Sequence, residues 1–259
     1  MRIGFVGAGN MATGLARGWS EAEGEPGAPA AMLFSDADTE RARALAEEVG
    51  GEAVEGNRAV AEAADLVVLA VKPNALDAVA GEVSKAGKPV LSILAGTTLE
   101  RLAEALPGVA LIRVMPNLGA QLRKAVLCVA YGDGIDAGLR EEAEAALALL
   151  GEVIELDEEL IDAATAIMGC APGYLALMAE ALVEAGKGEG LSEEQAQAMA
   201  AKAMSATGGL LEVREPGELK RAVASPGGMT EAGLEALEER DFRAALQAAV
   251  DASLTRVRG

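Results

Sequence analysis

The chain has 259 residues, of which 51% are apolar and 2% aromatic, and its net charge is −19. An acidic surface of this kind argues against nucleic acid or an anionic membrane as a partner, because both bind basic surfaces. The chain has no histidine and two cysteines, which excludes catalysis by a histidine base and histidine-ligated zinc, and two cysteines alone cannot form a zinc site. The sequence gives no sign of a metal. The few cysteines fit a cytoplasmic protein, and we expect neither a signal peptide nor a membrane-spanning segment.

In the first half of the chain, short apolar runs alternate with Ala/Glu-rich stretches. Strands are predicted over 2–6, 31–35, 66–71, 89–94 and 110–115, with weaker candidates over 126–130 and 152–155, and helices over 38–49 and 74–86. Strands that are apolar throughout indicate a sheet covered on both faces. The alternation is typical of an α/β, doubly wound parallel sheet of the Rossmann type, which we place over residues 1–156.

The second half has helical spacing and no strand pattern. Helices are predicted over 157–187, with an interruption at Pro172-Gly173, then from Ser192 to about 212, and over 216–223, 229–239 and 241–257. We therefore expect an all-helical C-terminal domain over residues 157–259. Its long helices carry more Ala, Leu and Met than a small domain easily buries, so we expect it to dimerise.

The residues that follow the first strand predict a dinucleotide site. Residues 2–12 read RIGFVGAGNMA. Gly7 permits the tight turn, Gly9 permits close approach of a pyrophosphate, and Ala12 permits close packing of helix on strand. Asn10 and Met11 open the helix, whose free N–H groups attract phosphate. The pattern predicts NADPH or NADH as cofactor.

The end of the second strand bears on the choice between these two cofactors. Ser35 and Asp36 lie where an acidic side chain binds the ribose 2′-hydroxyl of NAD and repels the 2′-phosphate of NADP. Asp36 favours NAD, but Ser35, Thr39 and Arg41 would hold a 2′-phosphate if Asp36 turned away. A third possibility is that Asp36 only caps the helix beginning near residue 38.

Two further segments lie where strands end or helices begin. Val71, Lys72 and Pro73 end a buried strand, at the crevice where such sheets bind ligands; the alternative for Lys72 is an ordinary surface lysine. Asn57 begins a helix, so it either caps that helix or faces the nucleotide.

Four motifs in order carry a specific resemblance. They are GAGNMA (7–12), LAVKP (69–73), RVMPN (113–117) and SPGGMT (225–230). Together they resemble the 1-pyrroline-5-carboxylate reductase family of proline synthesis, and residues 91–102 and 215–246 fit the same family. The resemblance implies a Rossmann domain followed by a helical domain that forms a homodimer or a larger homo-oligomer. It also implies reduction of a cyclic imine carboxylate by a nicotinamide cofactor.

The resemblance also implies the substrate residues. Ser225, Gly227, Gly228 and Thr230 would line the substrate pocket, and Met115 and Asn117 would contact the cofactor. Pro-Gly-Gly before a helix exposes backbone N–H groups that suit a carboxylate. Thr230 would be catalytic, with its hydroxyl bonded to the substrate nitrogen. A protonated imine is already electrophilic, so the chemistry needs no histidine.

The chain departs from the family pattern near the expected pocket. Residues 168–174 read MGCAPGY, with Met168, Cys170 and Ala171 where the family usually has Ser, Ser and Gly. Leu118-Gly119 replaces Thr-Pro, Gly173 replaces Ala, and Met229 stands at a Thr position that varies. These changes leave open a related or larger-ring imine as substrate.

Two other functions are possible. A β-hydroxyacid dehydrogenase would need a lysine on the first long helix of its second domain, yet no lysine lies between Asp157 and Gly186. A non-catalytic dinucleotide-binding paralogue stays possible because of the changes near the pocket. Cys170 has no histidine to activate it, so we interpret it as a packing or pocket-lining residue.

Overall fold

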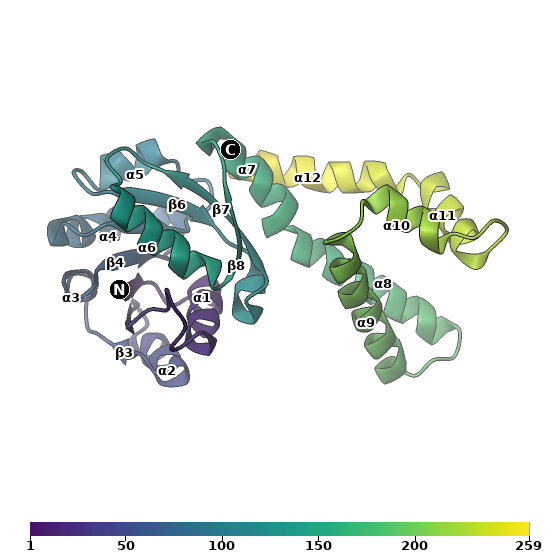
Figure 1. The fold of residues 1–259 in the computed structure, drawn as a ribbon, viewed down its shortest axis with the longest axis horizontal. Helices are drawn as coiled ribbons and strands as arrows, with labels where there is room; N and C mark the ends of the chain where they lie inside the picture. The colour runs from purple at the N-terminus through teal and green to yellow at the C-terminus, as the bar shows by residue number, and fades with distance from the viewer. Residues whose placement is uncertain (259) are drawn as a thin grey trace. The chain divides into compact units, whose positions relative to one another are not determined.

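The computed structural model describes the backbone of residues 1–258 and the side chains of residues 1–257. Within that range one sheet has the order β3-β2-β1-β4-β5-β6-β7-β8 (Figure 1). Its one antiparallel pair among these residues is β6 with β7, and β8 pairs parallel to β7. The strands are β1 Arg2–Val6, β2 Ala31–Ser35, β3 Glu52–Ala53, β4 Leu66–Leu69, β5 Val90–Ser92, β6 Leu111–Met115, β7 Ala125–Tyr131 and β8 Gly151–Glu155. The helices between them are α1 Asn10–Glu21, α2 Thr39–Val49, α3 Asn57–Ala63, α4 Leu76–Val83, α5 Leu99–Ala105 and α6 Ala137–Ala148.

The sheet is buried on both faces, as its uninterrupted apolar strands predict. In β4, Leu66 and Val68 belong to one hydrophobic cluster while Val67 and Leu69 belong to the other. The first cluster includes Trp19 of α1, whose Nε1 donates to the carbonyl of Ala146 in α6 at 2.7 Å. This packing fixes α1, and with it the glycine-rich turn, on the sheet.

The predicted strands and the doubly wound fold are confirmed, and the differences are local. The two-residue strand β3 and the helices α5 and α6 had no prediction of their own. Strand β4 ends at Leu69, two residues before the predicted end, because Val71 and Lys72 already lead into the turn at Pro73. Asp38, and not Asp36, caps α2, since its side chain accepts from the N–H of Arg41.

The long predicted helix over 157–187 is not continuous. A 3-10 turn, Glu158–Leu160, leads into α7 Ile161–Ala164, a π-helical turn at Thr165–Gly169 and then α8 Ala171–Gly188. Pro172 lies in the first turn of α8, so it opens a helix where an interruption was expected. Proline is tolerated there because a first-turn N–H has no partner within the helix.

The chain divides into two compact units. One comprises Met1–Gly169 with the C-terminal residues from Val257, and the other comprises Cys170–Arg256. The predicted domains were divided at 156/157; residues 158–169 fall within the first unit because Ile161 is buried with Met115 and Cys128 on the sheet. The predicted second domain ends at residue 259, which lies outside the described residues.

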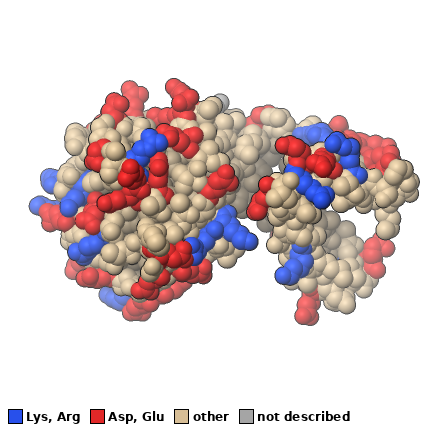
Figure 2. Space-filling model, viewed as in Figure 1, with Lys and Arg blue, Asp and Glu red and all other residues tan. Residues whose placement is uncertain are grey.

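The second unit is helical. It holds α8, α9 Glu193–Leu211, α10 Pro216–Val223, α11 Met229–Glu239 and most of α12 Phe242–Arg258. Ser192 caps α9 in a reciprocal arrangement with Gln195, as the sequence predicts. On the face shown in Figure 2, α8 and α9 present mostly uncharged side chains. Leu175, Leu177, Leu182 and Met199 are all more than half exposed.

One helical stretch passes a simple length-and-composition test for a membrane-spanning segment. The helical stretch Glu158–Gly188 is long and apolar enough to cross a membrane, with a mean hydropathy of 1.6 over its most apolar window. The criterion concerns length and composition alone. A helix that buries an apolar face against a second copy of the chain passes the same test.

Candidate dinucleotide and substrate sites

The glycine-rich turn has the geometry that its sequence predicts. Gly7 has a φ of 101°, and a Cβ there would lie 2.7 Å from the carbonyl oxygen of Ala70. Its N–H donates to the carbonyl of Ser35 at 2.8 Å. The positive φ and the close approach of the Ala70 carbonyl both require glycine. Gly7 thereby lets the ends of β1, β2 and β4 lie together.

Gly9 faces open space and begins α1. A Cβ added to Gly9 would meet nothing within 4 Å. Among residues 1–258, no side chain caps α1 and no acidic residue lies in its first turn. The N–H groups of Asn10 and Met11 are therefore free to bind a phosphate, with support from the helix dipole. The residues of this cradle fit a dinucleotide pyrophosphate.

Asp36 is turned toward this cradle. Its Oδ2 accepts from the N–H of Ala8 at 2.7 Å and its Oδ1 from the N–H of Asp38 at 2.9 Å. Arg41 lies 3.7 Å from the same carboxylate and also contacts Asp38. The guanidinium that a 2′-phosphate would need is thus already paired with two carboxylates.

Ser35 and Asn57 lie side by side behind Asp36. The Ser35 hydroxyl lies 3.0 Å from Asn57 Oδ1 and 3.3 Å from the carbonyl of Phe5. Asn57 is the first residue of α3 and Gly56 is its cap, so the capping alternative for Asn57 is wrong. A pocket of about 310 Å³ adjoins these residues and is lined by Asp36, Thr39, Ala42, Arg43, Ala53, Val54, Glu55 and Gly56.

The remaining predicted cofactor residues lie at the carboxyl ends of β4 and β6. Val71 is half-buried beside Gly7, whereas Lys72 and Pro73 are exposed. Met115 is buried at the end of β6, and Asn117 follows it. These ends share one edge of the sheet because β4, β5 and β6 are parallel.

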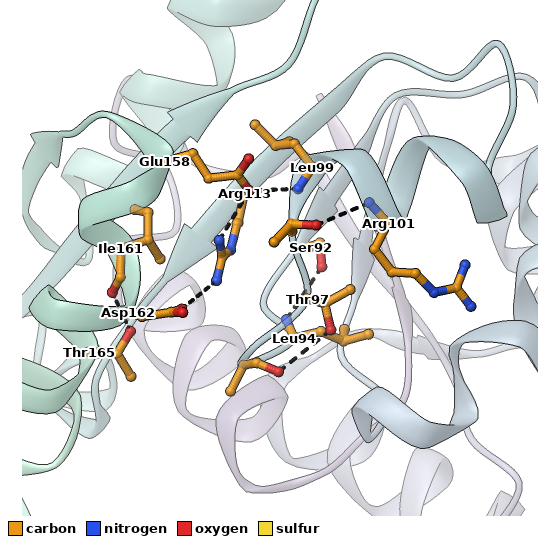
Figure 3. A network of polar contacts seen from close by, with 12 residues as sticks. Ser92, Leu94, Thr97, Leu99, Arg101, Arg113, Glu158, Ile161, Asp162 and Thr165 are labelled. Atoms are coloured by element: carbon orange, nitrogen blue, oxygen red, sulfur yellow. Dashed lines mark hydrogen bonds and ion pairs between the residues drawn. The ribbon is translucent and has the colours of Figure 1, made fainter. Parts of the chain in front are cut away.

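A buried arginine in β6 is the main feature that the sequence analysis missed. The Arg113 side chain is 2% exposed and donates to Glu158 Oε1 at 3.0 Å and Asp162 Oδ1 at 2.9 Å (Figure 3). Glu158 Oε1 also accepts from the N–H of Leu99 at 2.6 Å. One signal was available, because Arg113 interrupts an otherwise apolar predicted strand.

The end of β6 is tied to the same distant segment a second time. The Asn117 side chain donates to the carbonyl of Met168 at 3.2 Å and accepts from the N–H of Gly119 at 3.1 Å. The residues around Met115 are therefore held between Arg113 and Asn117, both bonded to residues 158–168. The amide of Asn117 is thus engaged with protein partners at both ends.

The cysteines offer no activated nucleophile. Cys128 is buried in β7, and burial raises the pKa of its thiol. Cys170 is half-buried and directly precedes α8. Within residues 1–258 there is no cluster of three His, Cys, Asp or Glu side chains arranged to bind a metal ion.

The predicted substrate residues lie together in the helical unit. Ser225, Gly227 and Gly228 form the turn before α11, and Thr230 lies in the first turn of that helix. Gly227 has a φ of 71°, and Gly228 donates its N–H to the carbonyl of Ser225 at 2.9 Å. Contrary to expectation, the Gly227 N–H is also engaged, since it donates to Glu231 Oε2 at 2.6 Å.

Comparison with known proteins agrees with this organisation. A family model described as pyrroline-5-carboxylate reductase dimerisation matches residues 158–259. Another, described as NADP oxidoreductase, coenzyme F420-dependent, matches residues 2–96. A pyrroline-5-carboxylate reductase of Thermus thermophilus is 37% identical over 257 residues, which cover 99% of this chain and 97% of the relative. The chain belongs to the pyrroline-5-carboxylate reductase family.

Other pyrroline-5-carboxylate reductases also match over nearly their full length. The Pseudomonas aeruginosa protein is 36% identical, with 98% of this chain and 95% of the relative covered. The structure of the Streptococcus pyogenes reductase has a TM-score of 0.89 at 26% identity and covers 100% of this chain and 98% of that one. The Plasmodium falciparum reductase, solved with NADP bound, has a TM-score of 0.87 at 25% identity, with 100% and 97% covered.

Membership in the pyrroline-5-carboxylate reductase family confirms the fold class and the resemblance. The chain is an oxidoreductase that depends on NADPH or NADH, and it has a dimerisation domain typical of a homo-oligomer acting on a small molecule. The dehydrogenase and non-catalytic alternatives are set aside. The roles of individual site residues stay predictions.

Proposed function

We propose that this chain reduces 1-pyrroline-5-carboxylate to L-proline, with NADPH or NADH as the hydride donor. The main support is the full-length match to reductases of that name. The chain also carries both parts that the reaction needs, a pyrophosphate cradle at Gly9 and a glycine turn before α11.

The cofactor binds at the carboxyl ends of the strands. Gly7, Gly9, Asn10 and Met11 bind the pyrophosphate through the start of α1, and Ser35, Asp36 and Asn57 face the adenosine ribose. Val71, Lys72, Pro73, Met115 and Asn117 line the path toward the nicotinamide. The bound cofactor supplies a hydride. The Arg113 contacts hold the end of β6 in place, so the position of Met115 is set before the cofactor binds.

The substrate binds at the turn before α11. Backbone N–H groups at the start of this helix bind the substrate carboxylate, and Ser225 and Thr230 offer hydroxyls. Thr230 bonds the ring nitrogen, which carries its proton before reduction begins. Hydride adds to the imine carbon, the C=N bond becomes CH–NH, and no further proton is needed from a histidine.

A second candidate substrate is a larger cyclic imine acid. The favouring observation is that Met168, in the π-helical turn, and Cys170 and Ala171, at the start of α8, are all half-buried where the family usually has polar residues and glycine. Apolar side chains there would suit an extra ring methylene.

The proposal also covers assembly and location. The exposed apolar side chains of α8 and α9 form a homodimer interface, with larger rings of dimers as a further possibility. In that assembly the apolar stretch 158–188 is buried against protein, which agrees with a cytoplasmic enzyme that uses neither a membrane nor nucleic acid as a partner.

An isotope experiment tests the reaction itself. With cofactor deuterated at the transferring position, we expect L-proline with deuterium at the ring carbon next to nitrogen that lacks the carboxylate. Deuterium elsewhere, or no proline, would refute the proposed reaction.

A further inference from the structure

A carboxylate of the chain already occupies the turn where the substrate carboxylate is proposed to bind. Glu231, in the first turn of α11, accepts from the Gly227 N–H through Oε2 at 2.6 Å. A carboxylate paired with a backbone N–H at this distance makes a strong, charge-assisted hydrogen bond. The donor that the glycine turn presents is therefore saturated by the protein.

The second N–H of the glycine pair, that of Gly228, is used within the turn itself. Gly228 donates to the carbonyl of Ser225, and a Cβ on Gly228 would lie 2.9 Å from that oxygen. Gly227 differs, since a Cβ there would meet nothing within 4 Å. A ligand can thus approach Gly227, and the group that it must displace is Glu231.

The surroundings of Glu231 contain cations that can receive a displaced carboxylate. Glu231 lines a groove of about 740 Å³ between α10 and α11, together with the cations Lys220 and Arg221 and three further glutamates of α11, Glu235, Glu238 and Glu239. Figure 2 shows basic and acidic side chains gathered side by side over these two helices. A displaced Glu231 would share these two cations with the other glutamates of the groove.

We infer that Glu231 is a specificity-determining residue that competes with the substrate carboxylate for the Gly227 N–H. The inference rests on the proposed function. A ligand with a carboxylate can replace the lost hydrogen bond in kind, whereas a neutral ring cannot. Removal of Glu231 should strengthen binding of carboxylate ligands and leave ligands without a carboxylate unaffected.

The direct test is ligand binding by calorimetry, with oxidised cofactor present. For Glu231→Ala, and more weakly for Glu231→Gln, we expect the Kd of L-proline to fall by about threefold to tenfold, the net size of one ordinary hydrogen bond. The Kd of pyrrolidine, which lacks the carboxylate, should not change. The control is Glu235→Ala, which removes a charge from the same groove one turn along α11.

Each outcome decides the inference. Equal effects of Glu231→Ala and Glu235→Ala would show a general charge effect and overturn it. Weaker binding of L-proline by Glu231→Ala would show that Glu231 only stabilises the turn. If Glu231→Ala does not fold, the Glu231→Gln result decides alone.

The same variants separate this inference from the proposed function. A wild-type protein that reduces no imine refutes the function and the inference with it. A wild-type protein that reduces 1-pyrroline-5-carboxylate, with an unchanged KM for the imine in Glu231→Ala, refutes the inference alone.

Discussion

The carboxylate of Asp36 accepts a hydrogen bond from the backbone N–H of Ala8, and the two atoms are 2.7 Å apart. The bond ties the end of β2 to the glycine-rich turn between β1 and α1. A negative charge is thereby fixed at the edge of the expected ribose site, where the charge of Arg41 is shared with Asp36 and Asp38.

Neutralising Asp36 should shift the choice of cofactor. In Asp36→Asn the side-chain oxygen still accepts from Ala8, but the charge that repels a 2′-phosphate is gone. We expect the ratio of kcat/KM for NADPH over NADH to rise by about tenfold, equivalent to about 1.4 kcal/mol. Steady-state kinetics with both cofactors measure the ratio, and an unchanged ratio would place the ribose elsewhere.

The two glycines of the turn should respond differently to alanine. Gly7→Ala places a Cβ against the Ala70 carbonyl at a positive φ, so we expect a loss of about 2–4 kcal/mol in the free energy of unfolding. Gly9→Ala meets open space at a φ of −77° and should fold normally. Its methyl group would instead lie where the pyrophosphate approaches, so cofactor binding should weaken. Thermal unfolding and calorimetric titration with NADPH distinguish the two effects, and normal cofactor affinity in Gly9→Ala would contradict the assigned cradle.

Removal of the buried Arg113 should destabilise the protein. In Arg113→Met, Glu158 and Asp162 lose the cation that they share. We expect the free energy of unfolding, measured in urea, to fall by about 3 kcal/mol. Adding Asp162→Asn should recover part of the loss. Arg58→Met is the matched control, since the exposed Arg58–Glu62 pair should contribute less than about 1 kcal/mol. Equal losses in both variants would show that the Arg113 network is no stronger than a surface pair.

A surface pair should contribute a pH-dependent part of the stability. Arg123 donates to both carboxylate oxygens of Glu25, at 2.6 and 2.7 Å, and these bonds lower the pKa of Glu25. A carboxyl with a lowered folded-state pKa stabilises the fold above its unfolded pKa, and that stabilisation is lost as the pH falls through the folded value. Glu25→Gln should therefore have a lower Tm than wild type at neutral pH and the same Tm in strong acid. Glu23→Gln is the control, and a Tm difference that persists in acid would contradict the pairing.

The exposed face of α8 should control assembly. Leu175 and Leu182, two turns apart, are each 51% exposed in the single chain. A double Leu→Glu substitution at these positions would place charges in an apolar interface, so we expect dissociation toward monomers in light scattering. Glu180→Gln, on the same helix, should leave the assembly intact. An unchanged mass in the double variant would mean that the dimer uses another face.

Local patterns predicted most of the fold because the relevant interactions are themselves local. The apolar runs at β1 and β2 and the Ser192 cap appear at the predicted residues. Helix α6 was not predicted. Its first two residues are Ala137 and Gly138, and glycine is a weak helix former. The π-helical turn at Thr165–Gly169, in which Ala166 is buried, is not revealed by a helical spacing of apolar residues.

The site was predicted in part for a similar reason. The glycine spacing identified the cradle because the tight turn at Gly7 and the open approach at Gly9 are set within a few residues of the chain. The partners of Arg113 lie 45 and 49 residues away in sequence, so no local pattern could name them. Glu231 is near Gly227 in sequence, yet its role depends on a backbone N–H whose direction only the folded turn defines.

The most direct test of the central claim is oxidation of NADPH and NADH by the purified protein with 1-pyrroline-5-carboxylate, run in parallel with the six-membered homologue. We predict turnover that depends on the imine, with the five-membered ring reduced and L-proline formed. Turnover of the six-membered ring alone would mean that the residues around Cys170 have changed the substrate. Cofactor binding without turnover of either imine would contradict the account.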